Sequence, residues 1–447
     1  MTGAVKAWLA RQAYTAVLRL GTPAYLWRVW ARGREEPAYR AHWPQRLGWY
    51  GSAHVAHVAQ AGAAERAGPL VWVHAVSLGE ARAAEPLVLA LRAALPGMRL
   101  LLTHTTATGR EAGAKLLQAG DVQTWLPYDT PGAVGRFLRT HRPAVGVLME
   151  TEVWPNLQHG ARRAGVPMVL ANARLSDKSL RQGLRFAALL RPAAQALRLV
   201  LAQTDADAAR LRQMGAADVA VCGNVKFDMA PPEALLTQGR AWGEASGLPV
   251  VLAASTREGE EPGLLAAWQA EPGAGAARLF IVPRHPQRFD EVAELVRACG
   301  WRLSRRSQWP DGQPDAEARE AEVWLGDSMG EMPAYYASAR VALLGGSFQP
   351  LGGQNLIEAA ACGCPVVMGP STFNFADAAE LSAAAGAAQR VDGWPAGVSA
   401  ALRACQPEDH ATAALQARQF AQAHRGAAAR MAAAIAALVQ AAPSRPV

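Results

Sequence analysis

Short apolar runs alternate with longer amphipathic stretches along most of the chain. Runs of this kind predict buried strands, and the stretches between them predict helices. The predicted strands are residues 71–74, 99–103, 145–149, 166–171 and 199–202, followed by 250–253, 279–282, 341–344 and 365–368. A regular alternation of strand and helix indicates an α/β protein with parallel, doubly wound sheets that carry helices on both faces.

The alternation stops once and then restarts. The motif Asn224-Val225-Lys226-Phe227-Asp228 ends the first series, and Pro231-Pro232 prevents its simple continuation. A chain of 447 residues that is 51% hydrophobic can form two globular domains. We expect domains at 36–228 and 229–447 that face each other across a cleft, with ligands bound beyond the carboxyl ends of the strands. Two smaller expectations are a surface loop at residues 305–320 and helix at residues 410–441.

Residues 1–35 are expected to form a separate helical segment. Basic residues interrupt it, so no apolar run approaches the ~18 residues of a membrane-spanning helix, and no cleavable signal is expected. Gly21-Thr22-Pro23 is expected to bend or break the helix. Trp8, Trp27 and Trp30 stand beside basic side chains, which favours a segment that lies in an anionic membrane surface. The alternative is a helix packed on the domain body.

The composition of the chain limits the kinds of partner that we expect. The formal net charge of +8 and the pI of about 9.6 favour an anionic partner. The basic residues are dispersed, without the aromatic-interleaved patch of nucleic-acid binders, so no nucleic acid is expected. Five cysteines without framework spacing indicate reduced thiols in a cytosolic setting. Cys362 and Cys364 have no further Cys/His cluster, so no metal site is expected, and they are expected to pack a helix end against the next strand.

A glycine-rich turn follows the predicted strand 341–344. It contains Gly345-Gly346-Ser347-Phe348 and then Gly352-Gly353-Gln354-Asn355-Leu356-Ile357-Glu358, which leads into a helix. Such a turn lets backbone N–H groups and the positive helix end approach a phosphate, and Glu358 could hold ribose hydroxyls. A nucleotide site and a tight turn packed for its own sake both remain open.

Polar residues also follow the predicted strands of the first half. Glu80 opens a helix after Ser77-x-Gly79, where it could deprotonate a hydroxyl or could simply be a favourable acidic residue in a first helical turn. Glu150 and Glu152 follow the strand 145–149, where one could face the cleft while the other braces a loop. Lys226 could neutralise charge at the domain junction or could be a solvated linker lysine.

In the second half of the chain, residues that could bind an anion also follow the predicted strands. Arg257 lies in the polar stretch after the strand 250–253. Arg284 and His285 follow the next strand, and guanidinium binds phosphate or carboxylate through two parallel hydrogen bonds. Met329, Gly330 and Glu331 could wall a base-binding pocket or merely cap a helix.

Taken together, the motifs resemble those of the Kdo transferases, which add 3-deoxy-D-manno-octulosonic acid to lipid A precursors. The resemblance runs in order through nearly the whole chain. Its motifs are Trp72 to Glu80, Met149 to Asn156, Gly223 to Asp228, Pro283 to Pro286, Gly352 to Glu358 and Gly369 to Phe375, and the N-terminal segment with Tyr39-Arg40 and Arg46-Leu47-Gly48 is similar as well.

The resemblance implies a GT-B glycosyltransferase with CMP-Kdo as donor, a lipid A precursor as acceptor, and inversion at the anomeric carbon without metal or cofactor. It also implies a place at the cytoplasmic face of the bacterial inner membrane, attached through residues 1–35. Domain 36–228 would bind the acceptor and domain 229–447 the donor. By motif, Glu80 would be the general base, with Glu150 and Lys226 steadying the transition state. CMP would contact Arg284, His285, Met329, Gly330, Glu331, Asn355, Leu356, Ile357 and Glu358.

Three positions depart from the family pattern. Arg257 stands where histidine is common, Leu356-Ile357 replaces a proline-containing pair, and Leu78 occupies a frequent valine position. Two other interpretations stay open. One is a different nucleotide-sugar enzyme of the GT-B fold, a glycosyltransferase or an epimerase. The other is a non-catalytic protein that binds a membrane surface through its basic residues.

Overall fold

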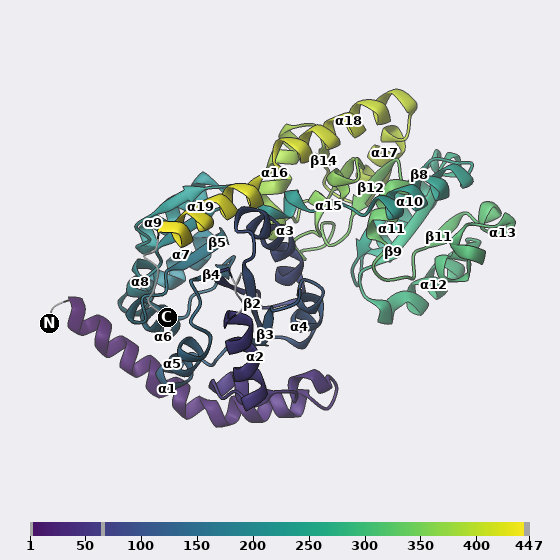
Figure 1. Cartoon of the computed structure of the whole chain (residues 1–447). Coiled ribbons are helices and arrows are strands. Elements are labelled where there is room, and N and C mark those ends of the chain that lie inside the picture. The colour runs from purple at the N-terminus through teal and green to yellow at the C-terminus, as the bar shows by residue number, and fades with distance from the viewer. Residues whose placement is uncertain (1–2, 64–67, 442–447) are drawn as a thin grey trace. The chain divides into compact units, whose positions relative to one another are not determined.

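A computed structural model describes residues 3–63 and 68–441, and the chain divides into two units (Figure 1). The first unit is formed by the chain up to Asp228 together with the segment from Arg425 onward, and the second by Met229–His424. Each unit is built on one seven-stranded parallel sheet. The predicted α/β class is therefore confirmed.

The first sheet has the order β3-β2-β1-β4-β5-β6-β7. The direction of the strand order reverses between β1 and β4, so the loops after these two strands diverge and leave a crevice at their carboxyl ends. The motifs that contain Glu80 and Glu150 follow these two strands. The strands are β1 Leu70–His74, β2 Arg99–His104, β3 Val122–Trp125, β4 Val145–Met149, β5 Met168–Ala173, β6 Leu199–Ala202 and β7 Val219–Val221.

Helices cover both faces of this sheet. Alternate residues of β1 point to opposite sides: Val71 and Val73 pack with α3 and α19, whereas Leu70 and Trp72 pack with α5 and α6. The helices of the first unit are α1 Gly3–Arg32, α2 Ser52–Ala63, α3 Leu78–Ala94, α4 Ala107–Ala114, α5 Pro131–His141, α6 Pro155–Arg163, α7 Asp177–Arg185, α8 Ala187–Gln195, α9 Asp205–Met214 and α19 Ala427–Ala441, with short 3₁₀ turns η1 Pro37–Tyr39, η2 Trp43–Leu47 and η3 Val225–Asp228.

The second sheet has the order β10-β11-β9-β8-β12-β13-β14 and reverses direction between β8 and β12. Its strands are β8 Val250–Thr256, β9 Arg278–Pro283, β10 Leu303–Arg305, β11 Val323–Leu325, β12 Val341–Leu344, β13 Val366–Met368 and β14 Ala388–Arg390. Its helices are α10 Glu233–Ala245, α11 Glu261–Ala270, α12 Phe289–Ala298, α13 Ala316–Glu320, α14 Met332–Ser338, α15 Leu356–Ala361, α16 Ala376–Ala384, α17 Trp394–Ala404 and α18 Pro407–Ala423, with 3₁₀ turns η4 Ala274–Ala276, η5 Pro286–Arg288, η6 Arg306–Gln308, η7 Pro310–Gly312 and η8 Phe373–Phe375.

All nine predicted strands are present, but β3, β7, β10, β11 and β14 were not predicted. Four of these, β3, β7, β10 and β14, are the edge strands of the two sheets. An edge strand is only partly buried, so its sequence need not be a continuous apolar run. The sequences Leu-Ser-Arg of β10 and Ala-Gln-Arg of β14 illustrate this.

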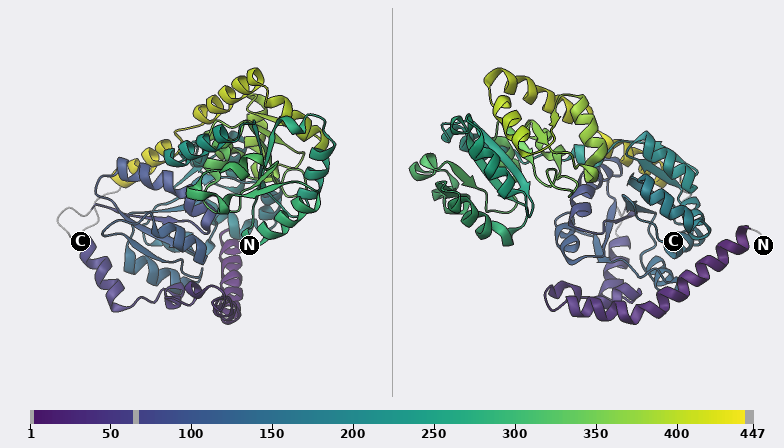
Figure 2. Two further views of the ribbon diagram at one scale, coloured as in Figure 1. Left: turned by 90° about the vertical axis from the view of Figure 1, so that its right-hand side faces the viewer. Right: turned by 180° about the vertical axis from the view of Figure 1, so that it is seen from behind.

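The N-terminal helix was expected to bend or break at Gly21-Thr22-Pro23; the break is contradicted, whereas Figure 1 shows that the helix is bent along its length. α1 continues without a break through Pro23 and is a single long helix at the edge of the first unit (Figure 2). Proline removes one backbone donor, and contacts elsewhere along the helix offset that loss. Thr15 is buried against Asn156 (Oγ1 to Oδ1, 3.2 Å), and the Tyr14 hydroxyl donates to Asp129 Oδ2 at 2.9 Å.

The predicted surface loop at residues 305–320 is only partly right, because most of the stretch is exposed but it is not an irregular loop. This stretch contains η6, η7 and α13, and Trp309 within it is only 5% exposed. The Trp309 ring lies 4.8 Å from that of Trp324, and its Nε1 donates to Ser304 Oγ at 2.9 Å. Trp309 was missed as a core residue because its neighbours in the sequence are polar, and the average polarity of the stretch predicts a surface position.

The domain boundary at the C-terminus differs from the prediction as well. The expected helix 410–441 is two helices, α18 and α19, and α19 packs on α3 in the first unit rather than in domain 229–447. Asp228 holds the start of α19: its carboxylate accepts hydrogen bonds from the N–H groups of Gly426 and Ala428. Arg430 Nη2 donates to Cys222 O at 2.8 Å. The chain therefore returns to the first unit after completing the second.

We predict that Asp228→Ala loosens α19. The substitution leaves two backbone donors without their acceptor, which costs about 2 kcal/mol, so α19 amides should exchange with deuterium roughly 30-fold faster. Asp409→Ala is the matched control, because Asp409 is an exposed aspartate in the first turn of α18. Equal exchange of α19 in the two variants would contradict the capping role.

Candidate active site

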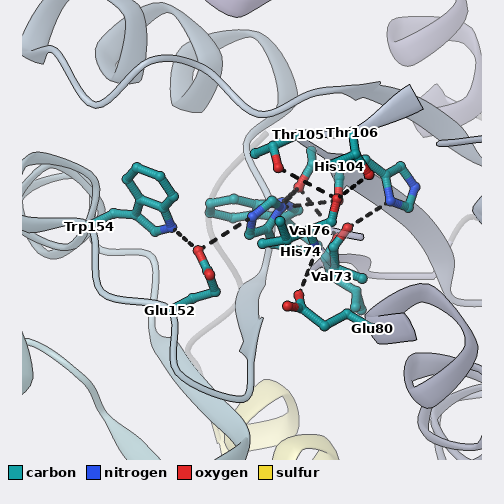
Figure 3. Close-up of polar contacts among 12 residues, drawn as sticks. Val73, His74, Val76, Glu80, His104, Thr105, Thr106, Glu152 and Trp154 are labelled. Atoms are coloured by element: carbon teal, nitrogen blue, oxygen red, sulfur yellow. Dashed lines mark hydrogen bonds and ion pairs between the residues drawn. The ribbon is translucent and has the colours of Figure 1, made fainter. Parts of the chain in front are cut away.

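Glu80 lies in the first turn of α3, directly after β1. Ser77 caps this helix in an extended conformation, and Glu80 Oε2 reaches back to accept a hydrogen bond from Val76 N at 2.7 Å (Figure 3). The carbonyl of Val76 accepts from the N–H and hydroxyl groups of Thr105 and Thr106. Both backbone groups of Val76 are thus used, which fixes the loop that carries Glu80.

The protonation of Glu80 is tuned by its surroundings. Burial raises the pKa of Glu80 to about 7, although the Val76 N–H group opposes this. The carboxylates of Glu150 and Glu152 raise the pKa further, and Lys226 lowers it. A carboxyl group whose pKa lies near neutrality can both accept and release a proton under physiological conditions, which suits a general base.

Glu150 occupies a strained position at the end of β4. Its φ of 57° is in the left-handed region, which residues other than glycine rarely adopt. Its buried carboxylate forms ion pairs with Lys226 Nζ at 3.0 Å and Arg174 Nε at 3.2 Å. Arg174, just after β5, was not singled out from the sequence. The only feature of the sequence that could have pointed to Arg174 is its position as a basic residue directly after a predicted strand.

Lys226 is positioned by a chain of amide hydrogen bonds to the sheet. Asn172 at the end of β5 accepts from Val225 N through its side chain and from Gln203 Nε2 through its backbone. Asn224 Nδ2 in turn donates to Gln203 Oε1 at 3.0 Å. These contacts attach η3 to the carboxyl edge of the sheet, so the three predicted catalytic residues, Glu80, Glu150 and Lys226, lie in one cluster.

Glu152 is held separately from Glu150. It accepts from Trp154 Nε1 at 2.6 Å, and its other neighbour is the buried ring of His74, whose Nε2 lies 3.9 Å from Glu152 Oε2 (Figure 3). Burial lowers the pKa of His74 to about 3, so the ring is neutral. The predicted division of labour, in which one glutamate of the pair braces a loop, agrees with the contact between Glu152 and Trp154.

In the second unit, the predicted donor residues gather at the carboxyl ends of β9, β11 and β12. Arg284 and His285 follow β9 and are exposed. Met329 is 62% exposed, Gly330 has a φ of 85°, and Glu331 accepts from Arg306 Nη2 at 2.8 Å. Because the strands are parallel, three loops far apart in sequence reach the same edge of the sheet.

The glycine-rich turn is organised by a residue that the sequence did not reveal. Buried Glu260 accepts from the N–H groups of Gly346 and Phe348, as well as from Arg257 N. Gly345 packs so closely on β8 that a Cβ atom would lie 2.3 Å from Ser255 O. The first part of the turn thus serves packing, and its N–H groups at Gly346 and Phe348 are already used within the unit. Phosphate contact by these groups is not supported.

The later part of the turn remains compatible with a nucleotide. Asn355 caps α15 and accepts from Ile357 N at 3.2 Å. The side chains of Leu356 and Ile357 are buried, so these two residues can offer a ligand backbone atoms only. Glu358 is partly exposed in the first turn of α15.

Within residues 3–63 and 68–441, no group of three or more His, Cys, Asp or Glu side chains is arranged to hold a metal ion. In the cluster around Glu80, the carboxylate of Glu150 is paired with Lys226 and Arg174.

The sequence is similar to known proteins of one family. The family model described as 3-deoxy-D-manno-octulosonic-acid transferase (kdotransferase) matches residues 41–229. The chain is 48% identical to a 3-deoxy-D-manno-octulosonic acid transferase of Bordetella pertussis, over 94% of this chain and 98% of the relative. It is 32% identical to the transferase of Haemophilus influenzae, over 81% of this chain and 82% of that relative.

Solved structures share the fold at low sequence identity. A glycosyltransferase from Rickettsia africae superposes with a TM-score of 0.57 at 11% identity, covering 84% of this chain and 99% of that one. A UDP-GlcNAc 2-epimerase from Neisseria meningitidis superposes with a TM-score of 0.55 at 15% identity, covering 83% and 99%. The GT-B-like fold is thus common to transferases and epimerases, and the sequence relatives decide between them: this chain belongs to the 3-deoxy-D-manno-octulosonic acid transferase family.

Proposed function

We propose that this protein transfers Kdo from CMP-Kdo to a lipid A precursor, with inversion at the anomeric carbon, and that Glu80 is the general base. The observation that carries the proposal is the cluster at the carboxyl edge of the first sheet. It combines a carboxyl group with a pKa of about 7 and the ion pair between Glu150 and Lys226. Inversion by direct displacement needs a single base, which takes the proton from the attacking sugar hydroxyl.

Glu150 and Lys226 are proposed to steady the transition state. An oxocarbenium-like centre develops positive charge, which the carboxylate of Glu150 can stabilise, and Lys226 limits the repulsion between Glu150 and Glu80. The strained backbone of Glu150 supports this role, since strain of this kind is retained where the position of a side chain matters.

The second unit is proposed to bind the donor, and the first unit the acceptor. Arg284 and His285, the loop from Met329 to Glu331, and the start of α15 from Asn355 to Glu358 would contact CMP. The leaving group is a phosphate, and a guanidinium can stabilise the charge that appears on it as the bond to Kdo breaks. Arg284 is exposed at a strand end, where it can reach a ligand.

Attachment to an anionic membrane surface is proposed for α1, at the cytoplasmic face of the bacterial inner membrane. Trp8, Leu20 and Trp27 are 53%, 83% and 74% exposed on this helix. Tryptophan and leucine beside basic residues favour the boundary between headgroups and acyl chains. Among the helices described, none is long and apolar enough to cross a membrane.

Glu80→Gln is expected to lower kcat for transfer by about 10²–10⁴-fold, because the proton of the acceptor hydroxyl loses its base. CMP binding, measured by calorimetry, should be unchanged because the nucleotide is assigned to the other unit. Glu85→Gln, an exposed glutamate on the same helix α3, is the matched control. Full transfer by Glu80→Gln would refute the assignment of the base.

The pH profile tests the tuning of Glu80. A base must be deprotonated, so kcat/KM on detergent-dispersed acceptor should fall as pH drops below about 7. Glu152→Gln removes a negative charge that raises the pKa of Glu80, so the acid limb should move to lower pH. A limb that stays in place, or moves upward, would contradict the electrostatic link between the two carboxylates.

Exposed tryptophans of α1 should contribute to membrane binding. We expect Trp8→Ala/Trp27→Ala to weaken partition onto anionic vesicles at least about tenfold, because two apolar side chains lose their place in the interface. Transfer to detergent-dispersed acceptor should be retained. Phe186→Ala removes an aromatic ring that is 65% exposed elsewhere in the same unit and serves as the control. Unchanged vesicle flotation of the double variant would exclude this role of α1.

A further inference from the structure

Two cavities lie on either side of α5 in the first unit, and we refer to them as the α5 cavities. The first, of about 790 Å³, is bounded by α2, α5 and Trp49, and the second, of about 550 Å³, by α1, α5 and α6. Arg99 opens β2 and Arg142 precedes β4, so the cavities reach the amino ends of the strands. Glu80 lies at the opposite, carboxyl edge of the sheet, and the α5 cavities are therefore separate from the catalytic cluster.

The walls of both cavities carry arginines and, among the described residues, no acidic side chain. Six arginines line the cavities, and none of them forms a salt bridge with another described residue: Arg11, Arg99, Arg136, Arg139, Arg142 and Arg163. A concave surface with one sign of charge and low-dielectric walls concentrates its potential and attracts counter-ions.

Arg99 is the arginine whose side chain most clearly lacks partners in the described part of the chain. Its Nε and Nη1 atoms are buried without a hydrogen-bond partner, and its guanidinium lies beside Gly62 of α2. The nearest acidic influence is Asp121, but that carboxylate already binds Arg92 Nη2, Leu100 N and Gln118 N. Buried guanidinium donors are costly to leave unpaired, so a ligand with several acceptor oxygens would relieve an existing deficit.

Arg142 adds a second anomaly. It ends α5 in the left-handed conformation, with a φ of 46°, where helices ordinarily place glycine or asparagine. Its side chain lines both cavities. Favourable interaction with the helix dipole can account for Arg139 and Arg142 at this helix end, but Arg99 starts a strand and Arg11 lies in the middle of α1. The charge thus converges on the cavities from four different elements.

The neighbouring surfaces identify the kind of ligand. Arg11 brings the second cavity into contact with α1, which exposes apolar and aromatic side chains such as Trp8, Leu20 and Trp27 beside basic ones. Trp49, 54% exposed, stands at the first cavity with Arg136 over its ring at 5.3 Å. Anion sites bordered by exposed tryptophan and leucine match the chemistry of a lipid headgroup, in which phosphate lies beside apolar chains.

We propose that the α5 cavities bind phosphate groups of anionic membrane lipids. The arginines hold the headgroups while α1 enters the interface, so the cavities select membranes by charge and α1 supplies apolar attachment. This inference rests on the membrane attachment proposed for α1, but it concerns different residues and does not depend on Glu80.

The test is partition of the full chain onto vesicles of phosphatidylcholine, with and without phosphatidylglycerol. Arg99→Gln/Arg142→Gly removes two cations, and glycine suits the left-handed position, so thermal stability should be kept. With roughly a fivefold contribution from each arginine near a charged surface, binding to the phosphatidylglycerol vesicles should fall about 30-fold. Binding to phosphatidylcholine alone should change little.

The control is Arg240→Gln/Arg403→Gln, which removes the same charge from a cavity of the second unit that also contains Glu244 and Glu271. This variant should bind as the unaltered protein does. Equal losses in the two variants, or none in the first, would overturn the proposal. Transfer to detergent-dispersed acceptor should be retained by both, whereas failure of the proposed reaction would appear in the unaltered protein.

A competition experiment separates lipid from soluble phosphate. Inorganic phosphate should displace the protein from phosphatidylglycerol vesicles no more than chloride of the same ionic strength does. Stronger displacement by phosphate, absent in Arg99→Gln/Arg142→Gly, would mean that the cavities take a soluble phosphate, and the lipid assignment would be wrong.

Discussion

Three carboxylates, Glu80, Glu150 and Glu152, lie together at one edge of the first sheet, and their mutual repulsion has to be offset for this unit to fold as it does. Glu80 and Glu152 find partners within their own loops, Val76 N and Trp154 Nε1, whereas Glu150 pairs with Lys226 and Arg174 from two other segments. Ion pairs of Glu150 thereby join the loops after β4 and β5 to the η3 turn, and Glu80 in the loop after β1 interacts with this centre through its charge. Burial raises the pKa of Glu80 to about 7, and the neighbouring carboxylates of Glu150 and Glu152 raise it further, so the arrangement at this edge also prepares a base.

In the second unit, one buried carboxylate holds the loops at the carboxyl edge of the sheet together. Glu260 gathers the N–H groups of Gly346, Phe348 and Arg257, so the loops after β8 and β12 are held side by side. Gly345 has to be glycine there, since a side chain would collide with the backbone of Ser255. The glycine-rich turn that first suggests a phosphate site therefore owes its opening residues to packing. The start of α15 and Arg284 are left as the parts suited to a nucleotide.

The strength of the apolar signal decided which elements the sequence could predict. Central strands such as β4 and β12 are buried on both faces, so they are continuous apolar runs and were found. The edge strands β7 and β14 are largely exposed and were missed. Trp309 was assigned to a surface loop because its neighbours are polar, and a break of α1 at Gly21-Thr22-Pro23 was left open beside a bend because local propensity ignores the contacts of Thr15 and Tyr14. In each error, a tertiary contact outweighed a local preference.

The sequence by itself determined the α/β class, the family, and the candidate residues Glu80, Glu150 and Lys226, because short motifs at strand ends retain their order whatever the packing around them. Only the tertiary structure decided that Arg174 and Lys226 share Glu150, that Glu260 occupies the first glycine turn, and that α19 returns to the first unit. The same holds for the arginines around α5, which come from positions 11 to 163 and meet only in the folded unit. Charges separated by a hundred residues interact through distance and burial, and neither quantity is a property of the linear chain.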